Sequence, residues 1–179
     1  MRLRTFFWIV ACAVALAVFS LLLGLRSYQV FTHEELVAVV RCQVSPKGSS
    51  YNFLLEFTPM ADGVPGPSQK FPMRGDQWMI GGEFLKWHPW LNWVGFKNCH
   101  KLTRINSRYL KVEHERKLPR SAYELNGGTV PFWLFLYRYG RWIPFVEAVY
   151  GNAAYVMMEP GSQWGVYVAS SGYLVKPLH

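Results

Sequence analysis

The chain begins with an apolar run, Thr5 to Leu25, that no charged residue interrupts. A helix needs about 20 predominantly apolar residues to cross the hydrocarbon core of a bilayer, so this run is long enough to span a membrane. Arg2 and Arg4 precede the run, and Arg26 follows it. The pattern therefore predicts a transmembrane helix within residues 1–26.

After a short connection, the pattern changes from continuous to alternating. Apolar side chains occupy every second position from Leu36 to Val44, and period two over this length predicts a β-strand. A turn at 45–50 leads to a second, antiparallel strand at 51–58. Residues 77–87 predict a further strand that is apolar on both faces. Its central glycine pair, Gly81 and Gly82, favours a bulge or sharp bend.

The remaining segments complete a mainly antiparallel β-domain. Residues 59–68 form a loop and residues 88–97 an aromatic loop or short turn. Residues 99–105 and 108–115 form a hairpin around Asn106 and Ser107. Further strands are predicted within 119–126, 153–158, 163–170 and 173–175. Many short strands separated by turn residues indicate a small barrel or a sandwich, and the pattern does not distinguish these two architectures.

One segment, residues 129–150, has a helical pattern. Thr129 can cap a helix, Pro131 suits its first turn, and Phe145 to Tyr150 can form a second helical turn. The segment is amphipathic and similar to helices that lie at a bilayer surface. Its candidate membrane-interface residues are Phe132, Trp133, Phe135, Arg138, Arg141 and Trp142. The segment could equally cover one end of a barrel, and Trp87, Trp90 and Trp93 could join either surface.

Composition and topology signals divide the chain into an anchor and one domain. Hydrophobic residues make up 51% and aromatic residues 17%, which excludes a disordered chain. The apolar run exceeds the core of a cleaved signal peptide and ends without a small-residue cleavage site, so it is predicted to be an uncleaved signal-anchor. The expected domains are the anchor at 1–26, a linker at 27–33 and an extracytoplasmic β-domain at 34–179. Arg2 and Arg4 favour a cytoplasmic N-terminus.

The charge of the chain does not predict a nucleic-acid partner. The formal net charge is +8, but three of the arginines flank the apolar run, which leaves the domain only moderately basic. Basic residues between Lys97 and Arg120 could contact anionic lipid head groups. Alternatively, they form an exposed strand face that Glu113 and Glu115 balance.

The cysteines and histidines give few candidates for chemistry. Cys42 and Cys99 could form a disulfide in an oxidising compartment, or remain as buried free thiols. His88, His100, His114 and Cys99 show no recognised metal-ligand spacing, and adjacent residues of a strand face opposite ways. No metal or cofactor is therefore expected.

No nucleophile motif or phosphate-binding loop occurs in the sequence. A non-catalytic protein is therefore expected, and an envelope enzyme would have to depend on Asp76, His88 and His114. A second alternative is a small barrel that binds a lipid or another apolar ligand through Trp78, Ile80 and Phe84. These three side chains could instead simply fill the core.

Five motifs carry a resemblance to a known family. They are Arg74-Gly75-Asp76-Gln77-Trp78, Leu85-Lys86-Trp87, Ser107-Arg108-Tyr109, the run from Pro144 to Ala154, and the run from Ser171 to Pro177. Together they resemble small bacterial inner-membrane proteins labelled as cation/multidrug efflux pumps or multidrug transporters. The third motif usually reads Gly-Arg-Tyr, so Ser107 departs from it.

The resemblance supplies no catalytic or binding residues. It implies a single-pass inner-membrane protein, and the arginines before the apolar run predict that the domain is periplasmic. Transporters build their site among several spanning helices, so one helix implies a role beside a transporter rather than transport by this chain alone. The expected function is a membrane-anchored binding or accessory module of an envelope complex, in contact with the bilayer and a membrane-protein partner.

Overall fold

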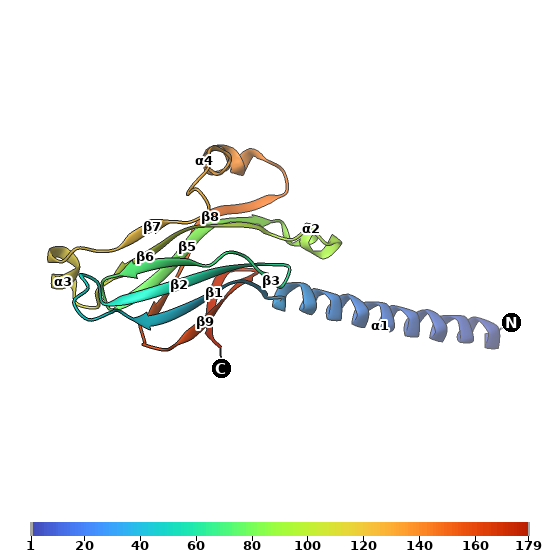
Figure 1. Ribbon diagram of the computed structural model, residues 1–179. Helices are drawn as coiled ribbons and strands as arrows, with labels where there is room; N and C mark the ends of the chain where they lie inside the picture. Colours follow the sequence, from blue (N-terminus) through green and yellow to red (C-terminus); the bar gives the residue numbers. More distant parts are fainter. Residues whose placement is uncertain (1, 179) are drawn as a thin grey trace.

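A long helix projects from a two-layered β-domain in the computed structural model, which describes residues 2–178 (Figure 1). Helix α1 (Arg2–Thr32) contains a stretch, Arg4–Gln29, that is long and apolar enough to cross a membrane. The helix continues through residues 27–32, so most of the segment assigned as a linker is helical. The segment contains no glycine or proline that would end the helix earlier. Only His33 and Glu34 separate α1 from the first strand.

The first sheet is antiparallel and has six strands. They are β1 (Glu35–Val44), β2 (Phe53–Ala61), β3 (Val64–Pro65), β4 (Gln69–Met73), β9 (Gln163–Ala169) and β10 (Gly172–Pro177). Their order is β10-β9-β1-β2-β3, and β4 also pairs with β2. The first strand of the domain, β1, and its last two strands, β9 and β10, therefore lie in the same sheet.

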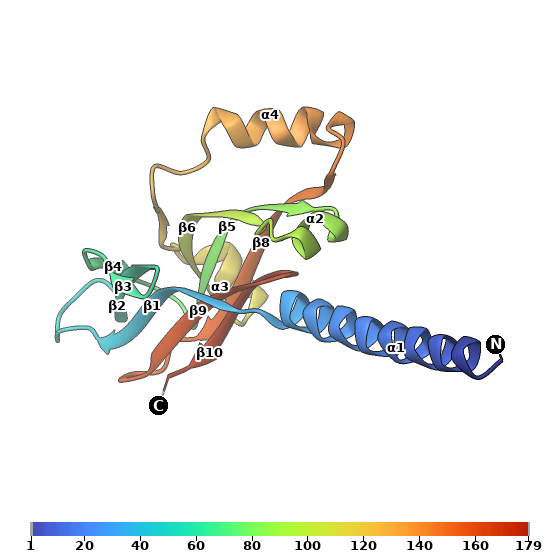
Figure 2. The same ribbon diagram turned by 90° about the vertical axis from the view of Figure 1, so that its right-hand side faces the viewer.

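The second sheet has the order β7-β6-β5-β8. Its strands are β5 (Gln77–Trp87), β6 (Cys99–Arg108), β7 (Ala122–Glu124) and β8 (Val146–Met157). The remaining helices are α2 (Pro89–Val94), α3 (Val112–Lys117), α4 (Pro131–Tyr139) and a 3-10 turn, η1 (Gly140–Trp142). Figure 2 shows α4 over the second sheet, on the side away from the first sheet.

The core lies between the two sheets. Val40, Leu55 and Phe57 of the first sheet pack in one cluster with Trp78 and Ile105 of the second. Within the described residues the sheets do not close into one barrel, so the architecture is two packed layers. Each fully buried large apolar side chain contributes about 1.5–3 kcal/mol to folding.

The predicted ligand-lining residues are part of this core. Trp78 and Ile80 are fully buried in the cluster between the sheets. Phe84 is also fully buried, with its ring against those of Tyr150 and Tyr173. These side chains pack against protein groups from both layers. Their positions favour a role in the core, which was the alternative to a role in ligand binding.

Strand β5 confirms the prediction for residues 77–87, including burial on both faces. The register against β6 shifts between Gly81, which faces Arg104, and Gly82, which faces Leu102. Thr103 is therefore the extra residue of a β-bulge, carried by β6. A Cβ atom on Gly82 would lie 2.1 Å from the Lys101 carbonyl oxygen, so only glycine fits this position.

Three local predictions are wrong. Residues 99–108 form one continuous strand, not a hairpin, because the Ser107 hydroxyl accepts a bond from the Ser121 backbone N–H at 2.9 Å. Residues 146–150 begin strand β8, because β5 offers them a paired edge. Strand β3 and its turn occupy part of the predicted loop at 59–68.

Candidate functional site

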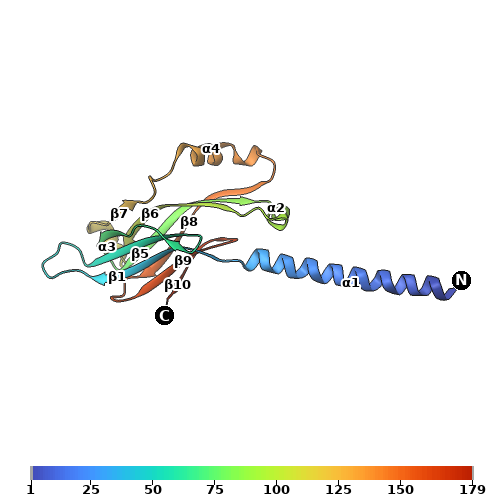
Figure 3. The same ribbon diagram turned by 45° about the vertical axis from the view of Figure 1, so that its right-hand side comes forward.

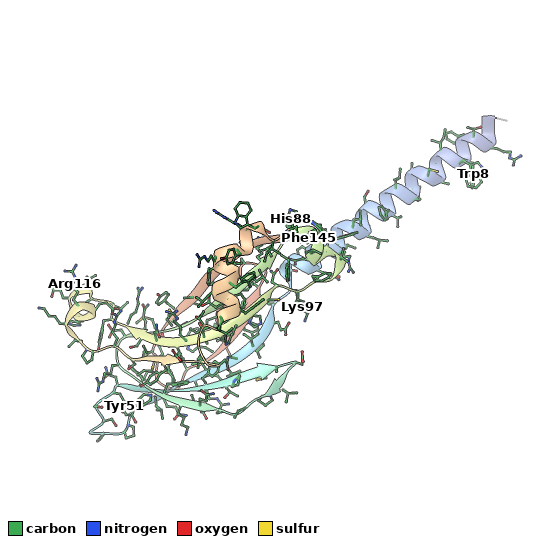
Figure 4. The ribbon with its side chains drawn as sticks, turned by 90° about the horizontal axis from the view of Figure 1, so that it is seen from above. Trp8, Tyr51, His88, Lys97, Arg116 and Phe145 are labelled. Atoms are coloured by element: carbon green, nitrogen blue, oxygen red, sulfur yellow. The ribbon has the colours of Figure 1, made fainter. Side chains whose placement is uncertain are left out.

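One end of the domain lies against the last turns of α1. Arg26 Nε donates a hydrogen bond to the Trp93 carbonyl oxygen at 3.1 Å, which joins α1 to α2. In Figure 4, Phe145 and Lys97 lie at this end, whereas Arg116 lies at the opposite end. We call it the helix-proximal end.

Exposed aromatic side chains gather at the helix-proximal end. Five residues, here named the aromatic surface, are between 39% and 72% exposed: Trp90, Trp93, Phe96, Trp142 and Phe145. Trp90 and Phe145 come from different segments and meet edge to face, with ring centroids 5.5 Å apart. Exposed clusters of large apolar side chains mark surfaces that contact other molecules or membranes.

Phe145 has an unusual backbone conformation. Its φ is +82°, a value that bulky residues rarely adopt because the side chain crowds the backbone. The Phe145 carbonyl oxygen accepts a hydrogen bond from the His88 N–H at 2.8 Å, which ties the segment to the end of β5. The strained conformation places the aromatic ring in the aromatic surface rather than in the core.

Helix α4 divides the predicted membrane-interface residues into two groups. Trp133 and Leu136 are buried against Leu85 on the outer face of the second sheet, so Trp133 belongs to a core cluster. Phe132 and Phe135 remain more than half exposed on α4. Trp142 is exposed on η1, beside the guanidinium of Arg141. Arg138 and Arg141 lie near aromatic rings, those of Tyr139 and Trp142, at 5.6 Å and 5.1 Å.

A buried carboxylate holds α4 against the sheet. Glu83 Oε1 accepts a hydrogen bond from the Thr129 hydroxyl at 2.9 Å, and Glu83 Oε2 accepts one from the Tyr137 hydroxyl. Burial, reinforced by the bond to Glu83, raises the pKa of Tyr137. Thr129 thus bonds to the sheet and does not cap the helix, whose N-cap residue is Val130. This cluster is structural.

A cavity of about 420 Å³ opens at the helix-proximal end. Its walls come from the end of α1, the segment that links α2 to β6, and the turn between β9 and β10. Asn92 and His100 line it, and each has a buried polar side-chain atom without a hydrogen-bond partner. The ion pair between Lys97 and Glu35, 2.9 Å apart, also borders the cavity.

The candidate catalytic residues do not come together. Asp76 precedes β5 and His88 follows it, so about 40 Å of extended chain separates them. Asp76 Oδ2 accepts a bond from the Leu110 N–H at 2.9 Å, which gives it a role in a turn. His114 lies in α3, its ring beside Tyr109. Among residues 2–178, no three His, Cys, Asp or Glu side chains cluster as metal ligands would.

Of the two alternatives for Cys42 and Cys99, the disulfide is not formed: both thiols are free, with Cys42 buried and Cys99 exposed. Cys99 is two residues from Lys97, which pairs with Glu35 at the start of β1. Cys42 lies seven residues after Glu35 on β1, about 23 Å from it in an extended strand. A disulfide requires Cα atoms within about 7 Å. Cys42 is buried in the core, and burial raises its pKa to about 11, which makes this thiol unreactive.

The predicted basic segment does not form one patch. Lys97 lies at the helix-proximal end and Arg116 at the other, as Figure 4 shows. Arg120 pairs with Glu115 at 2.9 Å on the surface. Such a distribution favours the interpretation of these residues as exposed, solvated side chains.

Sequence reasoning missed Asn92 and Glu83. Asn92 is the lone polar residue of the helix Pro89–Val94. A single amide among apolar residues could have indicated a buried polar group. Glu83 lies in a strand whose other side chains are almost all apolar, which was a similar signal. His100 was considered only as a metal ligand.

Comparisons with known proteins give no assignment. No protein-family model, no curated protein and no solved structure matches the chain.

Proposed function

We propose that this protein is a non-catalytic binding module that is anchored in the bacterial inner membrane and rests on the periplasmic surface of the bilayer. The observation that carries the proposal is the contact of α2 with α1 at Arg26. Arg26 lies three residues before Gln29, the last residue of the stretch that is apolar enough to span. With α1 across the bilayer, this contact supports a position of the aromatic surface at the depth where the helix leaves the bilayer.

The chemistry of the aromatic surface supports this placement. Tryptophan is enriched at membrane–water interfaces, where its ring contacts acyl chains and its N–H reaches water or head groups. Three of the five residues of the aromatic surface are tryptophans, on two separate segments. Insertion of such side chains by about 5–10 Å would cover apolar area that the folded domain leaves exposed.

The orientation and compartment are also proposals. Arg2 and Arg4 support a cytoplasmic N-terminus, because short basic flanks stay on the cytoplasmic side. The domain that follows α1 would then be periplasmic, and the resemblance to small inner-membrane proteins supports the choice of membrane.

An accessory role in an envelope complex is supported by α4. Trp133 and Leu136 bind this helix to the domain, while Phe132 and Phe135 of the same helix remain exposed. These side chains suit an apolar membrane-protein partner. A photoreactive residue at Phe135 should crosslink to such a partner, and one at Val112 of α3 should not.

Spin labels on matched valines test contact with the bilayer. Val94 in α2 and Val112 in α3 are exposed to similar extents, 59% and 66%, at opposite ends of the domain. Each is changed to Cys in a chain carrying Cys12→Ser and Cys99→Ser, with the buried Cys42 left in place. In lipid nanodiscs, the label at position 94 should be accessible to oxygen and shielded from a water-soluble nickel chelate.

The label at position 112 should show the opposite accessibilities. Equal access of the nickel chelate to both labels would contradict docking on the bilayer. In intact cells, a maleimide that cannot cross the inner membrane should react with the Val112→Cys variant. Failure to react there, with reaction after lysis, would place the domain in the cytoplasm.

A further inference from the structure

The cavity at the helix-proximal end lies at the level where α1 would leave a bilayer. Gln29, the last residue of the apolar stretch Arg4–Gln29, is part of its wall. A volume of about 420 Å³ lies within the usual range of small-molecule sites, roughly 300–1,000 Å³. Phe96 and Val168 supply apolar wall, so the cavity suits a ligand with both polar and apolar parts.

One buried polar side chain that lines the cavity has an oxygen without a hydrogen-bond partner. Asn92 is only 7% exposed, and its Oδ1 accepts no hydrogen bond from any group that the structure describes. Buried polar atoms in folded proteins are nearly always paired, so an unpaired buried acceptor requires an explanation. A ligand with an N–H or O–H donor at this point would satisfy it.

His100 adds a second buried polar atom to the same wall. Its Nδ1 also lacks a partner. Burial lowers the pKa of His100, which leaves the imidazole neutral near pH 7 and able either to donate or to accept a hydrogen bond. Two residues that line one cavity thus carry a buried, unsatisfied polar atom each, which points to a site for a polar ligand.

Both signs of charge border the cavity. Lys97 and Glu35 face each other across 2.9 Å, and both are partly exposed to solvent. A zwitterionic ligand fits this arrangement, because its cation can approach Glu35 while its anion approaches Lys97.

We infer that this cavity binds the phosphoethanolamine head group of a bilayer lipid, with its ammonium at Asn92 Oδ1 and Glu35 and its phosphate at Lys97. The inference deepens the proposed function and rests on it, since the bilayer supplies the ligand. The acyl chains of the lipid would continue along α1 beneath the aromatic surface.

The ammonium group decides between head groups. A primary ammonium carries three N–H donors, enough for Asn92 and Glu35 together. A trimethylammonium carries none, so phosphatidylcholine would leave Asn92 Oδ1 unpaired. Phosphatidylglycerol brings no cation for Glu35, so it matches only the basic half of the cavity.

Native mass spectrometry of the full chain released from nanodiscs tests the assignment. The discs contain equal mole fractions of phosphatidylethanolamine and phosphatidylcholine with matched acyl chains. Retained phosphatidylethanolamine should exceed phosphatidylcholine by about tenfold, as the loss of a charge-assisted hydrogen bond predicts. Equal retention of the two lipids by the wild-type chain would overturn the inference, and this outcome requires no substituted chain.

Two substitutions localise the site. Asn92→Leu, which removes the acceptor and keeps the branching at Cγ, should abolish the preference for phosphatidylethanolamine. Asn52→Leu, at an exposed asparagine near the opposite end, is the matched control and should keep it. An unchanged preference in Asn92→Leu would refute the assignment to this cavity.

Two further readouts separate the possible failures. Soluble glycerophosphoethanolamine should not displace the retained lipid, and full displacement at equal concentration would overturn the bilayer source. The spin label at position 94 reports contact with the bilayer independently of head-group choice. A shielded label without head-group preference refutes only this inference, whereas a water-exposed label refutes the proposed function.

Discussion

At the scale of single residues, Phe145 shows how the domain keeps an aromatic ring on its surface. A φ of +82° costs a bulky residue on the order of 1–3 kcal/mol. The hydrogen bond from the His88 N–H and the ring contact with Trp90 hold the residue in this conformation. Strain of this kind persists where the surrounding structure enforces it, and here it accompanies exposure rather than burial.

Paired substitutions at Phe145 separate backbone strain from the aromatic ring. Phe145→Gly and Phe145→Ala both remove the ring, but only glycine adopts a positive φ without steric cost. We expect the glycine variant to be more stable than the alanine variant by about 1 kcal/mol. Urea unfolding of the full chain in detergent micelles, followed by tryptophan fluorescence, measures the difference. Equal stability, or a more stable alanine variant, would show that the conformation carries no strain.

At the scale of the elements, the bulge between β5 and β6 depends on Gly82. A Cβ there would approach the Lys101 carbonyl oxygen to 2.1 Å and the Tyr173 hydroxyl to 2.7 Å. Gly151 on the neighbouring strand β8 would place its Cβ 3.6 Å from the Tyr137 hydroxyl, an ordinary contact. The two glycines therefore differ in packing although they lie in the same sheet.

Substitution of these glycines by alanine should give unequal results. Gly82→Ala should lower the free energy of unfolding by about 1–3 kcal/mol, because strands β5 and β6 must separate to admit the methyl group. Gly151→Ala should change it by less than about 0.5 kcal/mol. Thermal unfolding monitored by circular dichroism in detergent compares both with the wild type. Similar losses in the two variants would contradict the role of Gly82 in the bulge.

The elements also show how far the sequence alone predicts this fold. Alternation over residues 36–44 predicted β1, and the apolar side chains on both faces of residues 77–87 predicted β5, which is buried on both faces. Asn106 and Ser107 looked like a turn, yet they continue β6 because Ser121 of a distant segment satisfies the Ser107 hydroxyl. Polar residues inside strands depend on partners that local sequence does not show.

The candidate site was less predictable than the strands. Its cavity joins Gln29, Asn92 and His100, which come from three separate elements. Sequence spacing does not show that these residues meet, because the tertiary packing of α1 against α2 creates the site. The sequence pointed to Trp90, Trp93 and Trp142 as possible surface residues, but not to the cavity beside them.

At the scale of the whole molecule, the cavity links pH to stability through His100. Burial lowers the pKa of this imidazole, and the carboxylate of Glu35 opposes that shift. Lys97 and His33 also border the cavity, and the Tyr173 ring packs edge to face on His100. In the folded state His100 releases its proton at lower pH than in the unfolded state. Unfolding below pH 6.5 therefore takes up a proton, and stability falls as pH drops through this region.

We expect His100→Gln to reduce this dependence of stability on pH between about 7 and 5, where an unperturbed histidine titrates. His114→Gln, at an exposed position in α3, should leave the dependence unchanged. Urea unfolding of the full chain at a series of pH values gives the slopes. A wild-type slope that persists in His100→Gln would assign the effect to another group.

The uninterrupted course of α1 has a mechanical consequence. The helix has 31 residues, about 46 Å of rigid rod, and passes directly into β1 with a second fastening at Arg26. Figure 3 shows the rod and the domain as one elongated body. A rod longer than the hydrocarbon thickness tilts when a bilayer becomes thinner, and a stiffly attached domain must lean with it. A change in bilayer thickness would thus move the far end of the domain sideways, and with it any molecule bound there.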